Sequence, residues 1–284
     1  MKATFHFAVA LSLCVFLPSL LSAQQFKLTA TNLSAYYFDN VYDLRKTGTA
    51  QTIPAGLVRF QANANNLFGT SVQHYNVGNG QVINPNLFNY AIPANNVVRN
   101  LRGSKYTETP TSYHIAGKVE ELVAGAIREH IFVLRVNSAT GVVMSSRRLV
   151  MPTTLLRPEI ANIIVIGESL VVSGTVLVNG GQVRVFAFRT DLNGNVINWF
   201  RVYHLTLTRD LSTNAQALIL DGANLVLAGV DRKNNRAVVF KVNPANGNIA
   251  TPTMSYSLCT PLSCRMINYA SIGRSGNYAN LVTQ

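Results

Sequence analysis

The sequence predicts an all-β fold built from a repeated unit of four short antiparallel strands, and three observations predict it. Gly141, Gly194 and Gly247 lie 53 residues apart twice over, each in a turn. Apolar residues alternate with mixed residues in every unit, which is the period of a strand. No amphipathic segment is long enough for a helix. This pattern is typical of β-propeller blades, because a sandwich needs no fixed long period and a β-solenoid uses rungs of roughly 20 to 30 residues.

The clearest unit is Val183–Tyr203, which predicts two strands around an Asn-Gly turn. Tyr203 and Tyr256 both follow their turn glycine by nine residues. The other strands of the later units align around this pair. First strands are expected at 160–166 and 215–220, second strands at 114–117, 171–174 and 226–229, and third strands at 132–137, 186–191 and 238–243. Each second strand ends on a glycine, which predicts a bulge or a close backbone approach.

The first copy is more diverged. Short strands are expected at 26–31 and 35–44, and the two-strand pattern recurs at 57–63 and 68–75, ending on Tyr75. A loop rich in Asn and Pro, 76–96, then separates this copy from the next. The approximate blades are 24–76, 77–150, 151–203 and 204–256, with a partial blade at 257–284.

The C-terminal segment 266–284 resembles strands one and two of a blade, with Ser275-Gly276 as their turn. About four and a half blades are therefore visible, and two interpretations are open. Either the C-terminus is truncated, or N-terminal strands at 57–75 complete the final blade. We favour truncation, because the first copy has strands one and two of its own.

The motifs FAFRTDLNGN, WFRVY and ILDGANLVLAG resemble the secreted bacterial β-propeller repeat proteins, whose blades combine a basic residue, Asp, Asn-Gly, an aromatic residue and Tyr. The resemblance covers 97–284 well and 24–75 weakly. Trp199 matches the aromatic position, whereas Ser146 and Pro252 replace it elsewhere. The resemblance implies a fold, since such families have varied roles.

Residues 1–23 have the layout of a secretory signal peptide: Lys2, an apolar run and small residues at Ser22 and Ala23. A lipobox ending at Cys14 is the weaker alternative, because Leu13 is too bulky. The apolar stretch 160–178 contains Glu168 and a Gly-Glu-Ser turn, so it predicts a hairpin rather than a membrane span. We expect a secreted, periplasmic or cell-surface protein whose mature chain has no transmembrane segment.

The mature chain is basic, with 23 Lys and Arg against 12 Asp and Glu once Lys2 is removed. This charge favours anionic partners such as acidic polysaccharide. A protein or an anionic glycan is the partner expected, and nucleic acid is not. A role in solubility alone is the simpler alternative, because no clustered patch stands out.

Two cysteines remain in the mature chain, Cys259 and Cys264. In an exported protein they predict a disulfide that closes a small loop. Two thiols with no nearby histidine cannot complete a zinc site. Asp39, Asn40 and Asp43 lack the spacing of a calcium loop, and we expect no metal or cofactor.

No catalytic motif is present, and the four mature histidines, His74, His114, His130 and His204, have no metal-site spacing. Glu120-Glu121 is a poor acid/base pair, because adjacent strand residues point to opposite faces. The one repeated polar feature is a basic residue at the same place on strand three: Arg135, Arg189 and Lys241. These three are candidate ligands for an anion, although pairing of each with an acid or solvent between blades is the favoured explanation.

These observations predict an exported, non-enzymatic propeller that acts as a binding or scaffold module for a protein or glycan surface. The alternative is a hydrolase or lyase with its active site at the mouth of the central channel.

Overall fold

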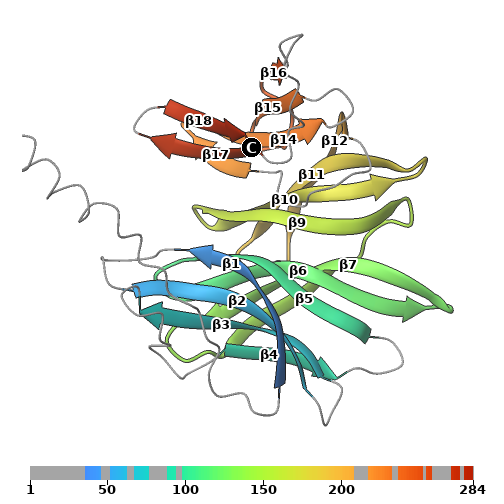
Figure 1. Ribbon diagram of the computed structural model, residues 1–284, viewed down its shortest axis with the longest axis vertical. Coiled ribbons are helices and arrows are strands. Elements are labelled where there is room, and N and C mark those ends of the chain that lie inside the picture. Colours follow the sequence, from blue (N-terminus) through green and yellow to red (C-terminus); the bar gives the residue numbers. More distant parts are fainter. Residues whose placement is uncertain are drawn as a thin grey trace, which may run out of the picture.

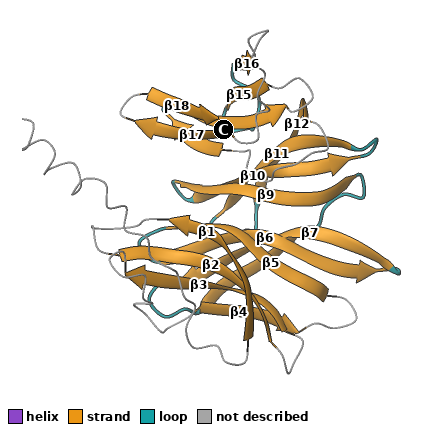
Figure 2. Cartoon of the chain, viewed as in Figure 1, coloured by secondary structure: helices purple, strands orange, loops and turns teal. Residues whose placement is uncertain are grey.

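The structure is a computed structural model that describes residues 36–45, 52–62, 67–76, 88–93, 98–207, 217–231, 236–251, 254–257, 270–275 and 278–283. All secondary-structure elements in these ranges are β-strands (Figure 2). The strands form four four-stranded sheets and one two-stranded sheet, and sequence neighbours pair antiparallel within each. The prediction of an all-β fold made of four-stranded units is confirmed.

The sheets follow one another along the chain. The first contains β1 (Tyr36–Arg45), β2 (Thr52–Ala62), β3 (Leu67–Asn76) and β4 (Phe88–Pro93). The second contains β5 (Val98–Glu108), β6 (Ser112–Val123), β7 (Ala126–Asn137) and β8 (Val143–Leu149).

The third sheet contains β9 (Leu155–Ile166), β10 (Ser169–Val178), β11 (Gln182–Asp191) and β12 (Ile197–Leu207). The fourth contains β13 (Ala217–Asp221), β14 (Asn224–Asp231), β15 (Arg236–Val242) and β16 (Met254–Ser257). The two-stranded sheet is β17 (Ala270–Ser275) and β18 (Tyr278–Thr283).

Successive sheets stack in chain order, from β1–β4 to β13–β16, with β17 and β18 after them (Figure 1). The first strands of neighbouring sheets lie against each other: β1 contacts β5, β5 contacts β9, β9 contacts β13 and β13 contacts β17. Four-stranded meanders whose first strands gather together in this way have the arrangement of β-propeller blades.

The first sheet differs from the sequence prediction at its outer strand. Residues 88–93 form β4, paired with β3, inside the segment 76–96 for which a loop was predicted. Phe88, Tyr90 and Ile92 alternate with other residues, which is a strand pattern too short to stand out from the surrounding Asn and Pro. The strands at 57–75 pair within this same sheet, and the described pairings of β17 and β18 are with each other.

The core lies between the sheets, because alternate residues of one strand face opposite neighbours. On β11, Phe186 and Phe188 pack in a cluster with the second sheet. Val185 and Ala187 pack in another cluster with Leu227 and other residues of the fourth sheet. A sheet buried on both faces explains why the central strands are almost continuously apolar.

Gly174 confirms the predicted close approach, but the predicted strand end is wrong, because β10 continues past Gly174 to Val178. A Cβ there would collide with the Glu159 carbonyl oxygen and lie 2.8 Å from the Phe186 ring. The β9–β10 register shifts at the same point, between Ser173 and Gly174. Within the described ranges, no helix is long and apolar enough to cross a membrane.

Candidate functional site

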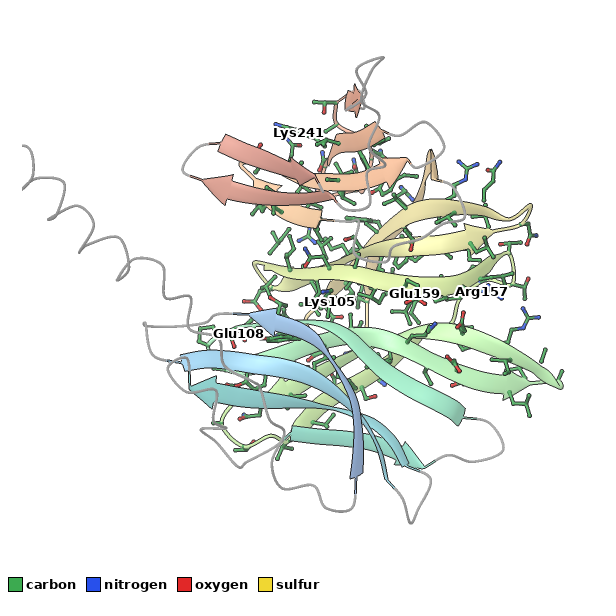
Figure 3. The ribbon with its side chains drawn as sticks, in the orientation of Figure 1. Lys105, Glu108, Arg157, Glu159 and Lys241 are labelled. Carbon is green, nitrogen blue, oxygen red and sulfur yellow. The ribbon has the colours of Figure 1, made fainter. Side chains whose placement is uncertain are left out.

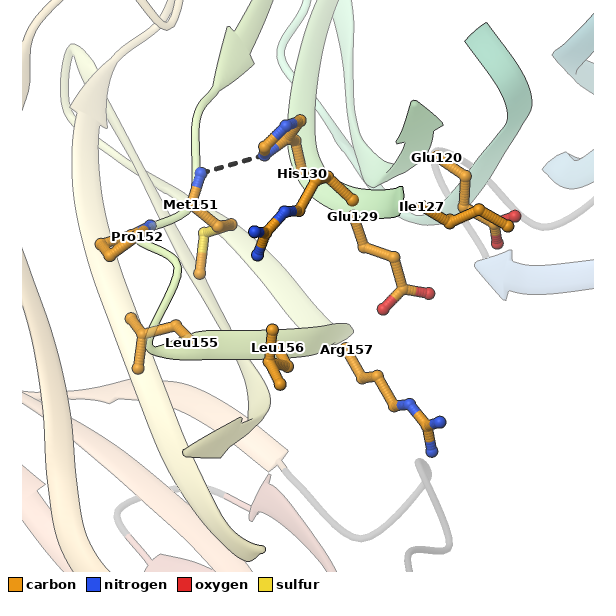
Figure 4. Close-up of a pocket in the computed structure, with 10 residues that line it drawn as sticks. Glu120, Ile127, Glu129, His130, Met151, Pro152, Leu155, Leu156 and Arg157 are labelled. Atoms are coloured by element: carbon orange, nitrogen blue, oxygen red, sulfur yellow. Dashed lines mark hydrogen bonds between the residues drawn. The ribbon is translucent and has the colours of Figure 1, made fainter. Parts of the chain in front are cut away.

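A cavity of about 390 Å³ opens between the second and third sheets (Figure 4). The end of β6, the start of β7, the connection from β8 to β9 and the start of β9 line it. The lining residues are Glu120, Ile127, Arg128, Glu129, His130, Met151, Pro152, Leu155, Leu156 and Arg157. A second cavity of about 430 Å³ lies between the same sheets, but no acid or histidine lines it. The first cavity is therefore the candidate active site.

The β6–β7 hairpin brings the acidic residues to this cavity. Val123 pairs with Ala126, and both turn residues, Ala124 and Gly125, have positive φ, as in a tight two-residue hairpin turn. The antiparallel register then places Glu120 opposite Glu129.

The adjacent acids Glu120 and Glu121 have different surroundings, as the alternation of a strand predicts. Glu120 lines the cavity. Glu121 is buried and forms an ion pair with Arg148. The two do not form an acid/base pair.

Lys118 joins two carboxylates from different sheets. Its Nζ donates hydrogen bonds to Glu129 Oε1 at 2.8 Å and to Glu159 Oε1 at 2.9 Å. Burial lowers the pKa of Lys118, but the hydrogen bonds and attraction of the two carboxylates outweigh it, and the net pKa is raised. The ammonium is therefore charged, and it holds Glu129 of β7 beside Glu159 of β9.

His130 is a neutral, oriented ring beside the cavity. The Met151 backbone N–H donates to its Nδ1 at 3.1 Å (Figure 4), so the neutral ring carries its proton on Nε2. Nε2 lies 3.8 Å from Glu121 Oε2. Burial is the main cause that lowers the pKa of His130, with Glu121 opposing it.

Arg128 and Arg157 bring positive charge to the cavity from two sheets. Figure 3 shows Arg157 and Glu159 along β9, between the second and third sheets. Arg157 has a φ of 48° although it is not glycine. The β9–β10 register shifts around it, between the pairs Thr175–Glu159 and Leu177–Leu156.

The sequence-predicted residues Arg135, Arg189 and Lys241 lie at the opposite end of the strands. Arg135 donates to Asn193 Oδ1 at 3.0 Å. Arg189 donates to the Pro244 carbonyl at 3.0 Å, and Lys241 pairs with Asp221 at 3.1 Å. Two of the three thus contact the turn of the following sheet. Anion binding by this set remains a prediction.

The remaining predicted residues fall partly outside the described part of the chain. His114 is buried on β6. The side chains of His74, His204, Asp39, Asn40 and Asp43 lie outside the described residues, as do residues 1–23, Cys259 and Cys264, so the signal peptide and the disulfide remain predictions. Across the described part of the chain, no three His, Cys, Asp or Glu residues gather where they could hold a metal ion.

Sequence analysis missed the Lys118–Glu129–Glu159 cluster. Lys118 and Glu159 are 41 residues apart and belong to no motif. The available signal was weak: an acid and a lysine in strands that are otherwise buried and apolar.

No protein-family model matches the chain, and no curated protein matches it. Among solved structures, a GH43 β-xylosidase/α-arabinofuranosidase from a compost microbial metagenome is 11% identical with a TM-score of 0.38, covering 66% of this chain and 73% of that one. The GH32 β-fructofuranosidase of Bombyx mori is 10% identical with a TM-score of 0.37, covering 88% of this chain and 56% of that one. A subtype N10 neuraminidase-like protein of A/little yellow-shouldered bat/Guatemala is 10% identical with a TM-score of 0.41, covering 78% of this chain and 70% of that one.

These comparisons correct two expectations. The β-propeller part of the predicted resemblance agrees with the structure, whereas no family model identifies a secreted repeat family. The preferred function, a non-enzymatic binding or scaffold module, is corrected by these findings: the similar solved structures include a β-xylosidase/α-arabinofuranosidase and a β-fructofuranosidase.

Proposed function

We propose that the protein is an exported hydrolase that cleaves glycosidic bonds in the cavity between the second and third sheets. The observation that carries the proposal is the Lys118 cluster, which brings Glu129 and Glu159 together from two sheets. Glycoside hydrolysis requires two carboxyl groups that flank one bond. Glu129 lines the cavity and is the residue we assign to proton transfer.

The charge of the cluster suits that chemistry. One ammonium beside two carboxylates leaves the cluster with a net negative charge, and glycoside hydrolysis requires one of two carboxyl groups to act as the acid and the other as the carboxylate. The acid protonates the leaving oxygen as the bond from the anomeric carbon breaks, and the carboxylate attacks that carbon. Water then hydrolyses the resulting ester.

The spacing favours retention of configuration. The two oxygens that bind Lys118 Nζ can be no farther apart than the sum of their 2.8 and 2.9 Å distances to it. Retaining enzymes place their carboxyl groups about 5 to 5.5 Å apart, whereas inverting enzymes leave roughly 6.5 to 9.5 Å for a water molecule. Apolar side chains of Met151, Leu155 and Leu156 line the same cavity and would exclude water from the sugar ring.

The test is bond cleavage by the purified protein on a panel of neutral and acidic oligosaccharides, measured as release of reducing ends. We expect Glu129→Gln to lower the rate by about 100-fold or more, the usual contribution of general acid–base catalysis. The amide retains an oxygen that can accept from Lys118, so the fold should survive.

The matched control is Glu168→Gln, which changes an exposed acid in the turn between β9 and β10 and should leave the rate unchanged. Equal rates in the two variants, or no cleavage of any substrate by the unaltered protein, would overturn the proposal.

A further inference from the structure

We infer that the cavity binds a sugar bearing a carboxylate, a uronic acid, through Arg128 and Arg157. The inference rests on the proposed function for its setting and adds the chemical class of the substrate.

Arg157 is held in an unfavourable backbone conformation. Its φ of 48° lies in the left-handed region, which costs a residue with a Cβ about 1 to 2 kcal/mol. It also precedes Pro158, and a following proline disfavours helical backbone conformations. Asparagine or glycine would fit this position with less strain. Strained residues concentrate at ligand sites, and Arg157 is one of the residues that line the cavity (Figure 4).

The charges around the cavity leave both arginines available. Within the described residues, neither the Arg128 side chain nor the Arg157 side chain forms a hydrogen bond or an ion pair. Two acids line the cavity, but Glu129 is bound to Lys118. Among the described residues that line the cavity, Glu120 is then the one acid not bound to Lys118, whereas two arginines contribute positive charge. The net positive charge favours an anionic ligand.

The two arginines enter from different sheets, Arg128 on β7 and Arg157 on β9. A planar guanidinium forms paired hydrogen bonds to a carboxylate, which a lysine ammonium cannot reproduce. The cavity volume of about 390 Å³ falls within the range of about 300 to 1,000 Å³ that is typical of small-molecule sites. A sugar ring with one carboxylate matches this combination of apolar walls and cationic ends.

The test measures binding rather than turnover. Trigalacturonate and maltotriose, an acidic and a neutral trisaccharide, are titrated by calorimetry into Glu129→Gln protein, which should not cleave them. We expect tighter binding of trigalacturonate. Adding Arg157→Asn removes the charge, and asparagine tolerates the left-handed backbone. This change should weaken the binding of trigalacturonate about 10-fold or more and leave the binding of maltotriose unchanged.

Two further variants serve as controls. Arg184→Gln removes a charge on β11 whose guanidinium bonds to Gln182, and it should change neither affinity. Arg128→Gln should repeat the selective loss and replaces the Arg157 variant if that one fails to fold.

Equal binding of the two trisaccharides, or an equal loss of both in the arginine variants, would overturn the acidic-substrate inference even if Glu129 proves essential for cleavage. Selective binding of trigalacturonate by a protein that cleaves no glycan would support the arginine subsite and overturn the proposed function alone.

Discussion

His114 is a buried base whose environment keeps it neutral. It has no exposed surface, and its Nε2 lies 3.0 Å from the Ser112 hydroxyl. Burial is the largest cause that lowers the pKa of His114 to about 4, and the nearby Arg135 guanidinium adds to it. An unfolded histidine has a pKa of about 6.5. Between these two values the unfolded chain binds more protons, so stability falls as the pH falls from about 6.5 towards 4.

This residue gives a prediction about acid stability. Between pH 7.5 and pH 4.5 the unaltered protein should lose about 2 kcal/mol more unfolding free energy than His114→Gln, which has no base at this position. Urea unfolding at the two pH values measures the difference. A parallel loss of stability in both proteins would show that the ring is protonated equally in the folded and unfolded chains.

At the scale of the elements, the turn between β15 and β16 accepts two hydrogen bonds from the preceding sheet. Trp199 Nε1 donates to the Pro244 carbonyl at 2.9 Å, and the Tyr203 hydroxyl donates to the Gly247 carbonyl at 3.0 Å. A Cβ on Gly247, whose φ is 74°, would lie 2.5 Å from Trp199 Cε3. The glycine, the aromatic residue and the tyrosine of the repeat are therefore partners across one blade junction.

Gly247→Ala should destabilise the protein by roughly 2 to 4 kcal/mol, because it combines left-handed strain with overpacking. Gly222→Ala is the matched control: its φ is 59° and no atom lies within 4 Å of the added Cβ, so only about 1 kcal/mol of strain is expected. Trp199 is the sole tryptophan, so its fluorescence reports both unfolding transitions. Similar losses in the two variants would mean that the Trp199 contact is relieved by a small shift.

At the scale of the whole molecule, polar contacts join one sheet to the next, and the Lys118 cluster is one of them. The side chains of Lys118, Glu129 and Glu159 are 9%, 18% and 22% exposed. Removing the ammonium would leave the largely buried carboxylates of Glu129 and Glu159 facing each other without the charge of Lys118 between them. The cost of breaking a buried ion pair in this way is about 3 to 5 kcal/mol.

Lys118→Met should therefore lower the unfolding free energy by about 3 kcal/mol or more. Lys241→Met removes a more exposed pair with Asp221 inside one sheet and should cost at most about 1 kcal/mol. Denaturant unfolding compares the two variants. If Lys118→Met were as stable as Lys241→Met, the cluster would contribute nothing to holding the second and third sheets together.

The sequence by itself determined the strands and their turns. The period of 53 residues, the alternation along 183–191 and the turn glycines at 194 and 247 are local signals, because strand periodicity and positive φ depend on residues close in the chain. The same alternation separated Glu120 from Glu121. Local signals failed at β4, whose short apolar pattern is confined to six residues.

The candidate site was decided only by the tertiary structure. Glu129 and Glu159 meet at Lys118 because β9 of the third sheet packs against the second sheet, and no spacing along the chain encodes that contact. The repeated basic residues Arg135, Arg189 and Lys241 were visible in the sequence because they recur. Arg128 and Arg157 were not, because neither recurs: the candidate cavity is lined by side chains that the other units do not repeat.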